Sequence, residues 1–278
     1  MAPLPALRIR HLGGLPGRPP LVVGPSLGTT VDRLWSGVAA ALPGWNILGW
    51  DLPGHGASPS VDRLVPAFTL ASLADAVLTS VAEVVGDVPF AYAGDSIGGA
   101  VGLQLALDHP DRVTSLAVLC SAPAFGAPSA WHERAALVRA EGMAPMVASS
   151  PGRWFGSALL AAADRERRIA DAVADLAAVD AESYARACEA LAGFDIRPRL
   201  GDLRVPLLAI AGADDLPTPP SVMADLVAAV PTGRLEVLDG VGHLAPYEAP
   251  EEVAALLTFA AAGGVAGSGS FRVDSPYF

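Results

Sequence analysis

Short apolar runs alternate with longer stretches of helical periodicity along most of this 278-residue chain. The alternation is typical of a mostly parallel sheet with helices on both faces, because strands buried on both sides are almost continuously apolar. A helix is predicted over residues 70–81, and another begins at Pro250, which two glutamates follow. Strands are predicted at residues 21–23, 47–50, 90–93, 116–119, 207–210 and 235–238. The sequence therefore predicts an α/β fold with a twisted, mostly parallel sheet.

One long segment interrupts this alternation and contains no predicted strand. Residues 122–199 are rich in alanine and have helical spacing, so we expect a helical cap inserted over the sheet. Residues 1–121 and 200–262 would then form the two parts of the core. Residues 263–278 begin with a stretch rich in glycine and serine, and we expect a flexible tail there.

The composition allows a large apolar core and excludes several kinds of chemistry. Hydrophobic residues make up 52% of the chain and charged residues 17%, which is typical of a folded globular protein. All 18 basic residues are arginine, which excludes a lysine-dependent phosphate loop, a Schiff-base lysine and pyridoxal-phosphate catalysis. Two cysteines, Cys120 and Cys188, are too few for a disulfide framework or a cysteine-rich zinc site. We expect neither a metal nor a cofactor.

The charge and the apolar pattern also limit the partners of the protein. The formal net charge of −11 at pH 7 argues against binding to nucleic acid or to an anionic membrane. Residues 1–10 lack the pattern of a secretion signal, and no apolar run reaches the ~18 residues of a transmembrane helix. We therefore expect a cytoplasmic protein that acts on a small molecule. The sequence favours no particular oligomeric state.

The sharpest functional signal is a serine between two glycines at a predicted strand-to-helix turn. The run Gly94-Asp95-Ser96-Ile97-Gly98-Gly99 follows the strand at 90–93 and precedes a helix predicted at 100–107. In such a nucleophile elbow the serine backbone is strained, so the residues two before and two after it must be small. The hydroxyl then projects above the sheet, and the N-terminus of the helix faces developing negative charge. Ser96 is therefore the predicted nucleophile.

A serine nucleophile needs a base, and the chain contains five histidines. His243 lies in the glycine-rich loop Gly240-Val241-Gly242-His243-Leu244, directly after the last predicted strand. This loop belongs to the carboxyl edge of the sheet, where catalytic groups gather in open α/β folds. His243 is therefore the predicted base. The others are interpreted as turn or surface residues: His11, His55, His109 and His132.

The imidazole in turn needs an acceptor for the proton on its other nitrogen. Two carboxylates, Asp214 and Asp215, follow the strand at 207–210 on the same edge of the sheet. An acid between the serine and the histidine is also the chain order expected of a nucleophile-elbow enzyme. Asp215 is favoured because the loop Leu216-Pro217-Thr218-Pro219-Pro220 follows it, and Asp214 remains the alternative.

Acyl transfer further requires donors for the oxyanion. The N–H of Ile97, directly after the nucleophile, is the first predicted donor. The second should come from the loop after the strand at 21–23, where Pro25 has no N–H to offer. Leu27 is therefore the second predicted donor, next to the small residue Gly28.

Several of these segments resemble the α/β-hydrolase superfamily across nearly the whole chain: the elbow, the turn Asp51-Leu52-Pro53-Gly54-His55-Gly56-Ala57-Ser58 and the Gly242-His243 loop. Other stretches resemble the 3-oxoadipate enol-lactonases of the β-ketoadipate pathway: Ser26-Leu27-Gly28-Thr29 with Trp35, Trp131 with Arg134, Gly142-Met143, Arg153-Trp154-Phe155, and Ala211-Gly212 through Thr218-Pro219-Pro220. The chain departs from the common superfamily pattern at Pro25 and Ser26 and at the elbow neighbours Asp95 and Ile97.

The resemblance implies a serine hydrolase of aromatic catabolism that opens the lactone ring of 3-oxoadipate enol-lactone to give 3-oxoadipate. The substrate carries one carboxylate, which requires a cation. Arg134 is the first candidate and Arg153 the second, with Trp131 and Trp154 against the apolar part of the substrate. The alternatives are a cofactor-free esterase, a perhydrolase or haloperoxidase-like hydrolase of another small ester, and a ligand-binding receptor on a hydrolase scaffold.

Overall fold

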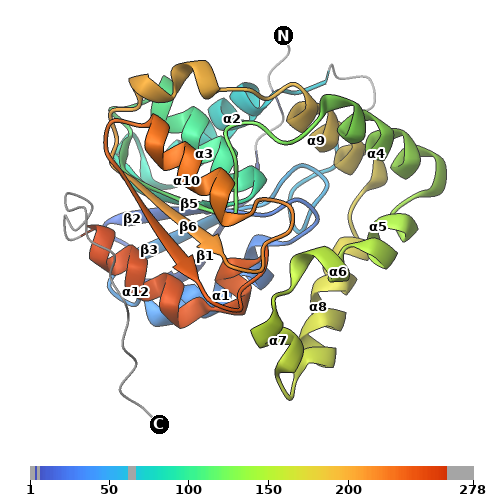
Figure 1. Cartoon of the computed structure of the whole chain (residues 1–278). Helices are drawn as coiled ribbons and strands as arrows, with labels where there is room; N and C mark the ends of the chain where they lie inside the picture. The colour runs from blue at the N-terminus through green and yellow to red at the C-terminus, as the bar shows by residue number, and fades with distance from the viewer. Residues whose placement is uncertain (1–3, 5–6, 62–66, 262–278) are drawn as a thin grey trace.

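The computed structural model describes residues 4, 7–61 and 67–261, in which a seven-stranded sheet carries helices on both faces (Figure 1). Six neighbouring strands are parallel, and β1 alone runs antiparallel to β3. Across the sheet the order is β1 (Ile9–Gly14), β3 (Asn46–Trp50), β2 (Pro20–Gly24), β4 (Phe90–Asp95), β5 (Val113–Leu119), β6 (Leu207–Gly212) and β7 (Gly233–Leu238). The prediction of an α/β fold with a mostly parallel sheet is confirmed.

The central strands form where the sequence is continuously apolar. Every residue of β3, β4 and β6 is buried, as expected of parallel strands covered on both faces. Strand β1 was not predicted, because it lies at the edge of the sheet and has the polar residues Arg10 and His11 exposed. An edge strand of this kind lacks the apolar run that identifies the others.

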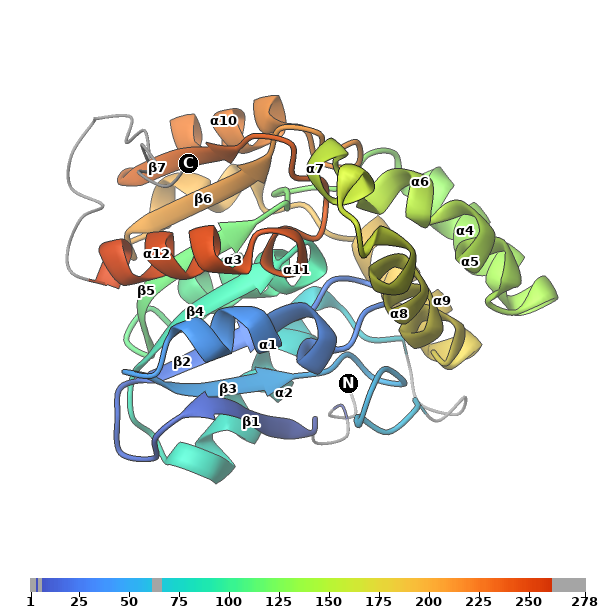
Figure 2. The ribbon, with the colours of Figure 1, turned by 90° about the horizontal axis from the view of Figure 1, so that it is seen from below.

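Helices cover both faces of the sheet (Figures 1 and 2). One face carries α1 (Val31–Ala41), α11 (Ala245–Glu248) and α12 (Pro250–Ala261), and the other carries α2 (Leu70–Val85), α3 (Ile97–Asp108) and α10 (Pro220–Ala229). Helix α2 begins with a capping box, in which Thr69 and Ser72 each accept a hydrogen bond from the other's N–H. Its buried side includes Leu73, Val77 and Val81, which have the predicted helical spacing.

The segment between β5 and β6 contains six helices and, among its described residues, no strand beyond an isolated bridge between Ala124 and Asp195. We call this segment the cap; it lies beside the carboxyl ends of the parallel strands (Figure 1). Its helices are α4 (Pro128–Glu141), α5 (Ala144–Ser149), α6 (Pro151–Trp154), α7 (Ser157–Ala161), α8 (Arg165–Ala177) and α9 (Ala181–Ala192), and a short 3-10 helix, Arg197–Asp202, leads into β6. The exact limits of core and cap stay a prediction, and the predicted tail, 263–278, lies outside the described residues.

Neither cysteine forms a disulfide: the thiols of Cys120 and Cys188 are both free and buried. No helix in the described ranges combines the length and the apolar character that crossing a membrane requires. Among the same residues, no three histidine, cysteine, aspartate or glutamate side chains gather in a way that could bind a metal ion.

Candidate active site

Ser96 occupies the sharp turn between β4 and α3. Its backbone has φ 52° and ψ −116°, and Cys120 is the only other non-glycine residue with positive φ in the described chain. The turn leaves no space for side chains on either side. A Cβ atom at Gly94 would lie 2.2 Å from the carbonyl oxygen of Gly98, and one at Gly98 would lie 2.6 Å from that of Pro25. Close packing therefore requires glycine at positions 94 and 98. The surrounding structure keeps the backbone of Ser96 in its strained conformation.

Three side chains from distant parts of the chain form a continuous hydrogen-bonded series. The Oγ of Ser96 lies 3.0 Å from Nε2 of His243, and Nδ1 of His243 lies 3.0 Å from both carboxylate oxygens of Asp215. All three residues are buried. Because a carboxylate only accepts hydrogen bonds, Nδ1 carries the imidazole proton and Nε2 is free to accept the serine hydroxyl. This is the arrangement in which an imidazole can take a proton from a serine.

The surroundings of Asp215 keep its carboxylate ionised. Burial opposes the charge, but the attraction of His243 and hydrogen bonds from His243 and Thr218 outweigh it, so the pKa of Asp215 is lowered. Thr218 donates from both its backbone N–H, at 3.0 Å, and its hydroxyl, at 2.7 Å. Thr218 belongs to the loop 216–220, on which the sequence-based preference for Asp215 over Asp214 depended. Asp214 instead accepts hydrogen bonds from the N–H and hydroxyl of Ser157 in the cap, at 2.8 and 2.6 Å.

Two backbone N–H groups beside Ser96 have no hydrogen-bond partner within the described residues: those of Leu27 and Ile97. Their neighbours are all engaged. The N–H of Gly28 donates to Nε2 of His55 at 3.2 Å, and that of Gly98 donates to the carbonyl of Pro25 at 2.9 Å. Leu27 lines the same cavity as Ser96, and Ile97 directly follows Ser96 at the start of α3. Both groups are therefore available to an oxygen atom that develops negative charge next to the serine.

A cavity of about 450 Å³ lies between the core and the cap, directly over Ser96. The core contributes Ser96, His243 and Leu27, and the cap contributes Trp131, Arg134, Arg153, Trp154 and Tyr184, among others. All four residues predicted to bind substrate thus line one cavity with the serine and histidine. Aromatic rings and aliphatic side chains provide most of the remaining wall, so the cavity suits a small, partly apolar ligand.

The cavity contains two arginines that are not neutralised by an acid. The guanidinium of Arg134 lies over the ring of Trp131, 4.5 Å from its centroid. The guanidinium of Arg153 donates to the carbonyl and hydroxyl of Ser149, both at 3.3 Å, and to the hydroxyl of Ser150 at 3.4 Å. Burial and then the charge of Arg134 lower the pKa of Arg153. In the described part of the chain neither arginine forms an ion pair with a carboxylate, and two converging cations would attract an anionic group.

Comparison with known proteins places this architecture in a family. Residues 19–250 match the model of the alpha/beta hydrolase fold. The chain belongs to the α/β-hydrolase family. It is 33% identical to 3-oxoadipate enol-lactonase 2 of Acinetobacter baylyi over 242 residues, which cover 86% of each protein. Its fold also matches the crystal structure of the enol-lactonase from Burkholderia xenovorans LB400, with a TM-score of 0.81. The two sequences are 29% identical, and the match covers 91% of this chain and 95% of the other.

A relative whose name gives another substrate is about as similar in sequence to this α/β-hydrolase. The pimeloyl-[acyl-carrier protein] methyl ester esterase of Aromatoleum aromaticum is 30% identical over 238 residues, which cover 81% of this chain and 91% of the relative. The family and a hydrolase function are therefore established, and the choice of substrate depends on the residues of the cavity.

The sequence analysis missed Glu248, which organises the histidine loop of this α/β-hydrolase. Its Oε1 accepts hydrogen bonds from the N–H groups of Gly242 and Leu244, at 3.1 and 3.2 Å, on either side of His243. Its Oε2 accepts one from Gly156 of the cap, at 2.7 Å. Burial raises the pKa of Glu248, although these three bonds favour its ionised form. The only signal in the sequence was that Glu248 is the one charged residue in the segment 244–250.

The histidine loop and the cap are also joined through their main chains. The N–H of His243 donates to the carbonyl of Trp154 at 2.7 Å, and the N–H of Ala158 donates to that of Gly240 at 3.0 Å. These bonds place Trp154 in the cavity wall and His243 beside Ser96 as parts of one hydrogen-bonded unit.

His55, interpreted from the sequence as a turn or surface residue, is completely buried. Its Nδ1 lies 2.9 Å from the carbonyl of Pro53, so this nitrogen carries the proton and Nε2 accepts from Gly28. Burial lowers the pKa of His55 to about 4, which keeps the ring neutral at pH 7. His55 therefore supports the loop that carries Leu27.

Asp95, one of the residues that departs from the superfamily pattern, is completely buried directly before Ser96. Desolvation, followed by the nearby charges of Asp215 and Glu248, raises its pKa well above the ordinary value. Burial in this position therefore disfavours the charged form of the Asp95 carboxyl.

Proposed function

We propose that this α/β-hydrolase is a serine-dependent lactonase that opens the ring of 3-oxoadipate enol-lactone and releases 3-oxoadipate. The observation that carries the proposal is the cavity over Ser96, which Arg134 and Arg153 line together with the serine and His243. Neither arginine is paired with an acid in the described part of the chain. A small ester with a carboxylate matches both features. The similarity to two enol-lactonases, one a curated relative and one a solved structure, supports the same substrate.

In the first half of the reaction, Oγ of Ser96 attacks the lactone carbonyl while Nε2 of His243 takes the hydroxyl proton. The Asp215 carboxylate accepts a hydrogen bond from Nδ1–H and stabilises the imidazolium that forms. The N–H groups of Leu27 and Ile97 donate to the oxyanion of the tetrahedral intermediate. When the intermediate collapses, the ring C–O bond breaks and the electron pair leaves on the enolate oxygen.

The leaving group makes this ring opening easier than ordinary ester cleavage. An enolate is a much weaker base than an alkoxide, so it departs with little help from an acid. It then takes the proton held on Nε2 of His243 to become the ketone, which leaves the imidazole neutral again. The acyl group remains attached to Ser96. A water molecule attacks it as His243 removes the water proton, and 3-oxoadipate is released while Ser96 regains its hydrogen.

The cap residues would hold the substrate in position for this chemistry. Arg134 is the first candidate for the substrate carboxylate, since its guanidinium lies over Trp131 and beside Tyr184 and forms no ion pair with an acid among the described residues. Arg153 is the second candidate, and its three serine contacts already orient it. Trp131 and Trp154 would pack against the apolar part of the ring. A charge-assisted pair between guanidinium and carboxylate gives both affinity and orientation.

A second candidate function is hydrolysis of another small ester with the same serine and histidine. It is favoured by the 30% identity to the methyl ester esterase, whose named substrate is a pimeloyl ester. Such an enzyme would use the same serine chemistry but would not depend on a carboxylate next to the scissile ester. The two functions therefore differ in what the arginines contribute.

The decisive experiment follows the loss of ultraviolet absorbance of the enol-lactone with purified protein, alongside p-nitrophenyl acetate as a neutral ester. The wild type should open the lactone at roughly 1–10³ s⁻¹, as enzymes usually do, with a kcat/KM well above that for the neutral ester. Ser96→Ala should bind but not turn over either substrate. Preference for the neutral ester would select the second function, and undiminished turnover by Ser96→Ala would overturn the serine mechanism.

A further inference from the structure

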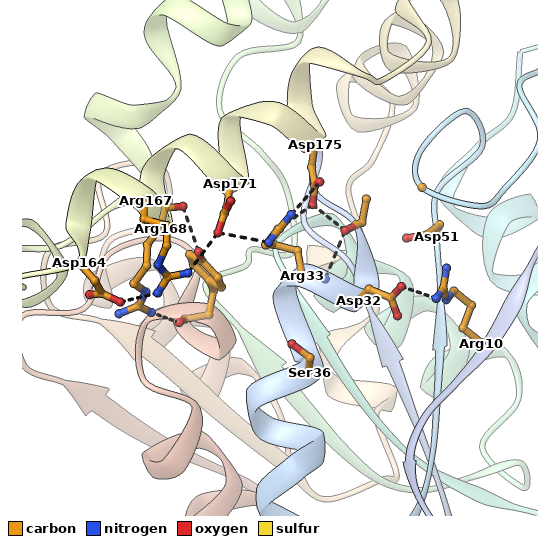
Figure 3. Close-up of a pocket in the computed structure, with 13 residues that line it drawn as sticks. Arg10, Asp32, Arg33, Ser36, Asp51, Asp164, Arg167, Arg168, Asp171 and Asp175 are labelled. Carbon is orange, nitrogen blue, oxygen red and sulfur yellow. Dashed lines mark hydrogen bonds and ion pairs between the residues drawn. The ribbon is translucent and has the colours of Figure 1, made fainter.

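A charged hollow of about 660 Å³ lies where cap helix α8 meets core helix α1, separate from the cavity over Ser96 (Figure 3). On the α1 side, Arg33 pairs with both Asp171 and Asp175 of α8, at 3.5 and 3.2 Å. The carboxylate of Asp175 also accepts a hydrogen bond from the hydroxyl of Thr30, at 2.7 Å. Its side chain is 18% exposed, so water competes only partly for these bonds.

Thr30 connects this ion pair to the loop that carries Leu27. It is the N-cap residue of α1, where its hydroxyl oxygen accepts from the N–H of Arg33 at 3.2 Å. The preceding turn is fixed by three hydrogen bonds between Ser26 and Thr29, at 2.9 to 3.2 Å. A displacement of Thr30 would therefore move the turn as a unit, and Leu27 lies within it.

Helix α8 also contacts this turn through apolar atoms. A Cβ atom placed on Gly28 would lie 2.5 Å from Cδ1 of Leu176, the residue after Asp175. Leu176 is completely buried. The helix therefore packs directly over the residue next to Leu27, and the neighbouring Asp175 ties the same turn of the helix to Thr30.

We propose that Asp175, on the cap, is a positioning residue for hydrolysis: it holds Thr30, and through Thr30 it aims the N–H of Leu27 at the developing oxyanion. The inference rests on the proposed serine mechanism but not on the identity of the ester. Its physical basis is that an oxyanion donor stabilises the transition state more than the bound substrate, so its misplacement lowers kcat rather than raising KM.

Asp171 provides a matched control on the same helix. It lies one turn before Asp175 and pairs with the same Arg33, and also with Arg167 at 3.3 Å (Figure 3). Among the described residues the hydroxyl of Thr30 donates to Asp175 and not to Asp171. Loss of either carboxylate weakens the attachment of the cap to α1. Only loss of Asp175 releases the turn. A role limited to docking the cap would thus affect both variants in the same way.

The test compares Asp175→Ala, Asp175→Asn and Asp171→Ala with the wild type, using the lactone or p-nitrophenyl acetate, whichever is turned over. Removing a complete oxyanion donor costs about 10²–10³-fold in kcat. We expect a 10- to 100-fold loss for Asp175→Ala, with KM within about threefold and a lower affinity for butylboronic acid, which forms a tetrahedral adduct with an active serine. Asp175→Asn keeps an acceptor for Thr30 and should recover most of kcat.

Equal losses in Asp171→Ala and Asp175→Ala, or an increase in KM with unchanged kcat, would overturn the positioning role. Melting temperatures of all variants show whether the protein remains folded. If Asp175→Ala does not fold, Thr30→Val removes the same hydrogen bond together with the N-cap bond from Arg33. It should give the same selective loss of kcat, and an unchanged kcat in that variant would overturn the inference. A wild type that neither binds butylboronic acid nor cleaves either ester would instead overturn the serine mechanism, and this inference with it.

Discussion

The carboxylates of Asp214 and Asp215 are adjacent in the chain but bind different parts of the molecule. Asp215 lies 3.0 Å from Nδ1 of His243, whereas Asp214 accepts from the N–H and hydroxyl of Ser157 in the cap. One residue thus faces the imidazole, and its exposed neighbour secures the cap to the loop after β6.

This difference predicts opposite outcomes for the two isosteric substitutions. Asp215→Asn should lower kcat about 10⁴-fold, because its amide donates to Nδ1 and forces the hydrogen onto Nε2, where it blocks proton transfer from Ser96. Asp214→Asn should keep kcat within a few-fold of the wild type. Steady-state kinetics of the two proteins tests the assignment, and a large loss in Asp214→Asn alone would reverse it.

The two cavity arginines should affect binding more than turnover. Arg134→Ala should raise KM for the lactone by one to two orders of magnitude, equivalent to about 1.5–3 kcal/mol for a charge-assisted bond. Arg153→Ala should have a smaller effect if Arg134 is the main partner of the carboxylate. Kinetics with a neutral aryl ester serves as the control, since its KM should change little in either variant. An unchanged KM for the lactone in both proteins would place the carboxylate elsewhere.

Glu248→Gln should destabilise the protein by about 1–3 kcal/mol, because an amide cannot accept all three N–H bonds and its NH₂ group faces a donor. The free energy of unfolding in urea measures this loss. Glu251→Gln, an exposed substitution in the first turn of α12, should change stability by no more than about 0.5 kcal/mol. Equal stability of the two variants would show that the buried hydrogen bonds of Glu248 contribute little.

His55 should make stability depend on pH in a defined window. Its pKa is lowered from 6.5 to about 4 in the folded state, so between these values the unfolded chain binds a proton that the native protein does not. Stability should therefore fall as pH decreases from 6.5 to about 4, by roughly 3 kcal/mol in total.

The measurement compares the free energy of unfolding across this range in wild type and His55→Gln. The variant should lose the His55 part of the slope, while His132→Gln, an exposed substitution on α4, should keep it. Parallel curves for wild type and His55→Gln would contradict the buried, neutral state of this histidine.

Features that depend directly on the type of residue at each position could be predicted from the sequence. Strands in the interior of a parallel sheet must be apolar, so the five inner strands were predicted. Of the two half-exposed edge strands, Gly233–Leu238 was predicted and Ile9–Gly14 was not. The topology of a parallel sheet also brings the loops that follow its strands together at the carboxyl edge. The structure accordingly brings Ser96 within hydrogen-bond distance of His243, 147 residues away.

The supporting contacts of the site could not be predicted in this way. Glu248 binds backbone N–H groups, which every residue except proline has, so no pattern of side chains identifies its partners. His55 likewise binds the N–H of Gly28. Asp175 contacts Thr30 across 145 positions, and only the packing of the cap on the core brings them together.

The main-chain bonds between Trp154 and His243 and between Ala158 and Gly240 have a consequence for engineering. Grafting a whole cap from another enzyme would replace one partner of each bond and so disturb the loop that carries His243 along with the wall of the cavity. Libraries aimed at new substrates would keep residues 154–158 as a fixed junction and diversify the inward side chains of α4 and α9 instead. Substitutions outside residues 154–158 can therefore change the shape of the cavity without moving the loop that carries His243.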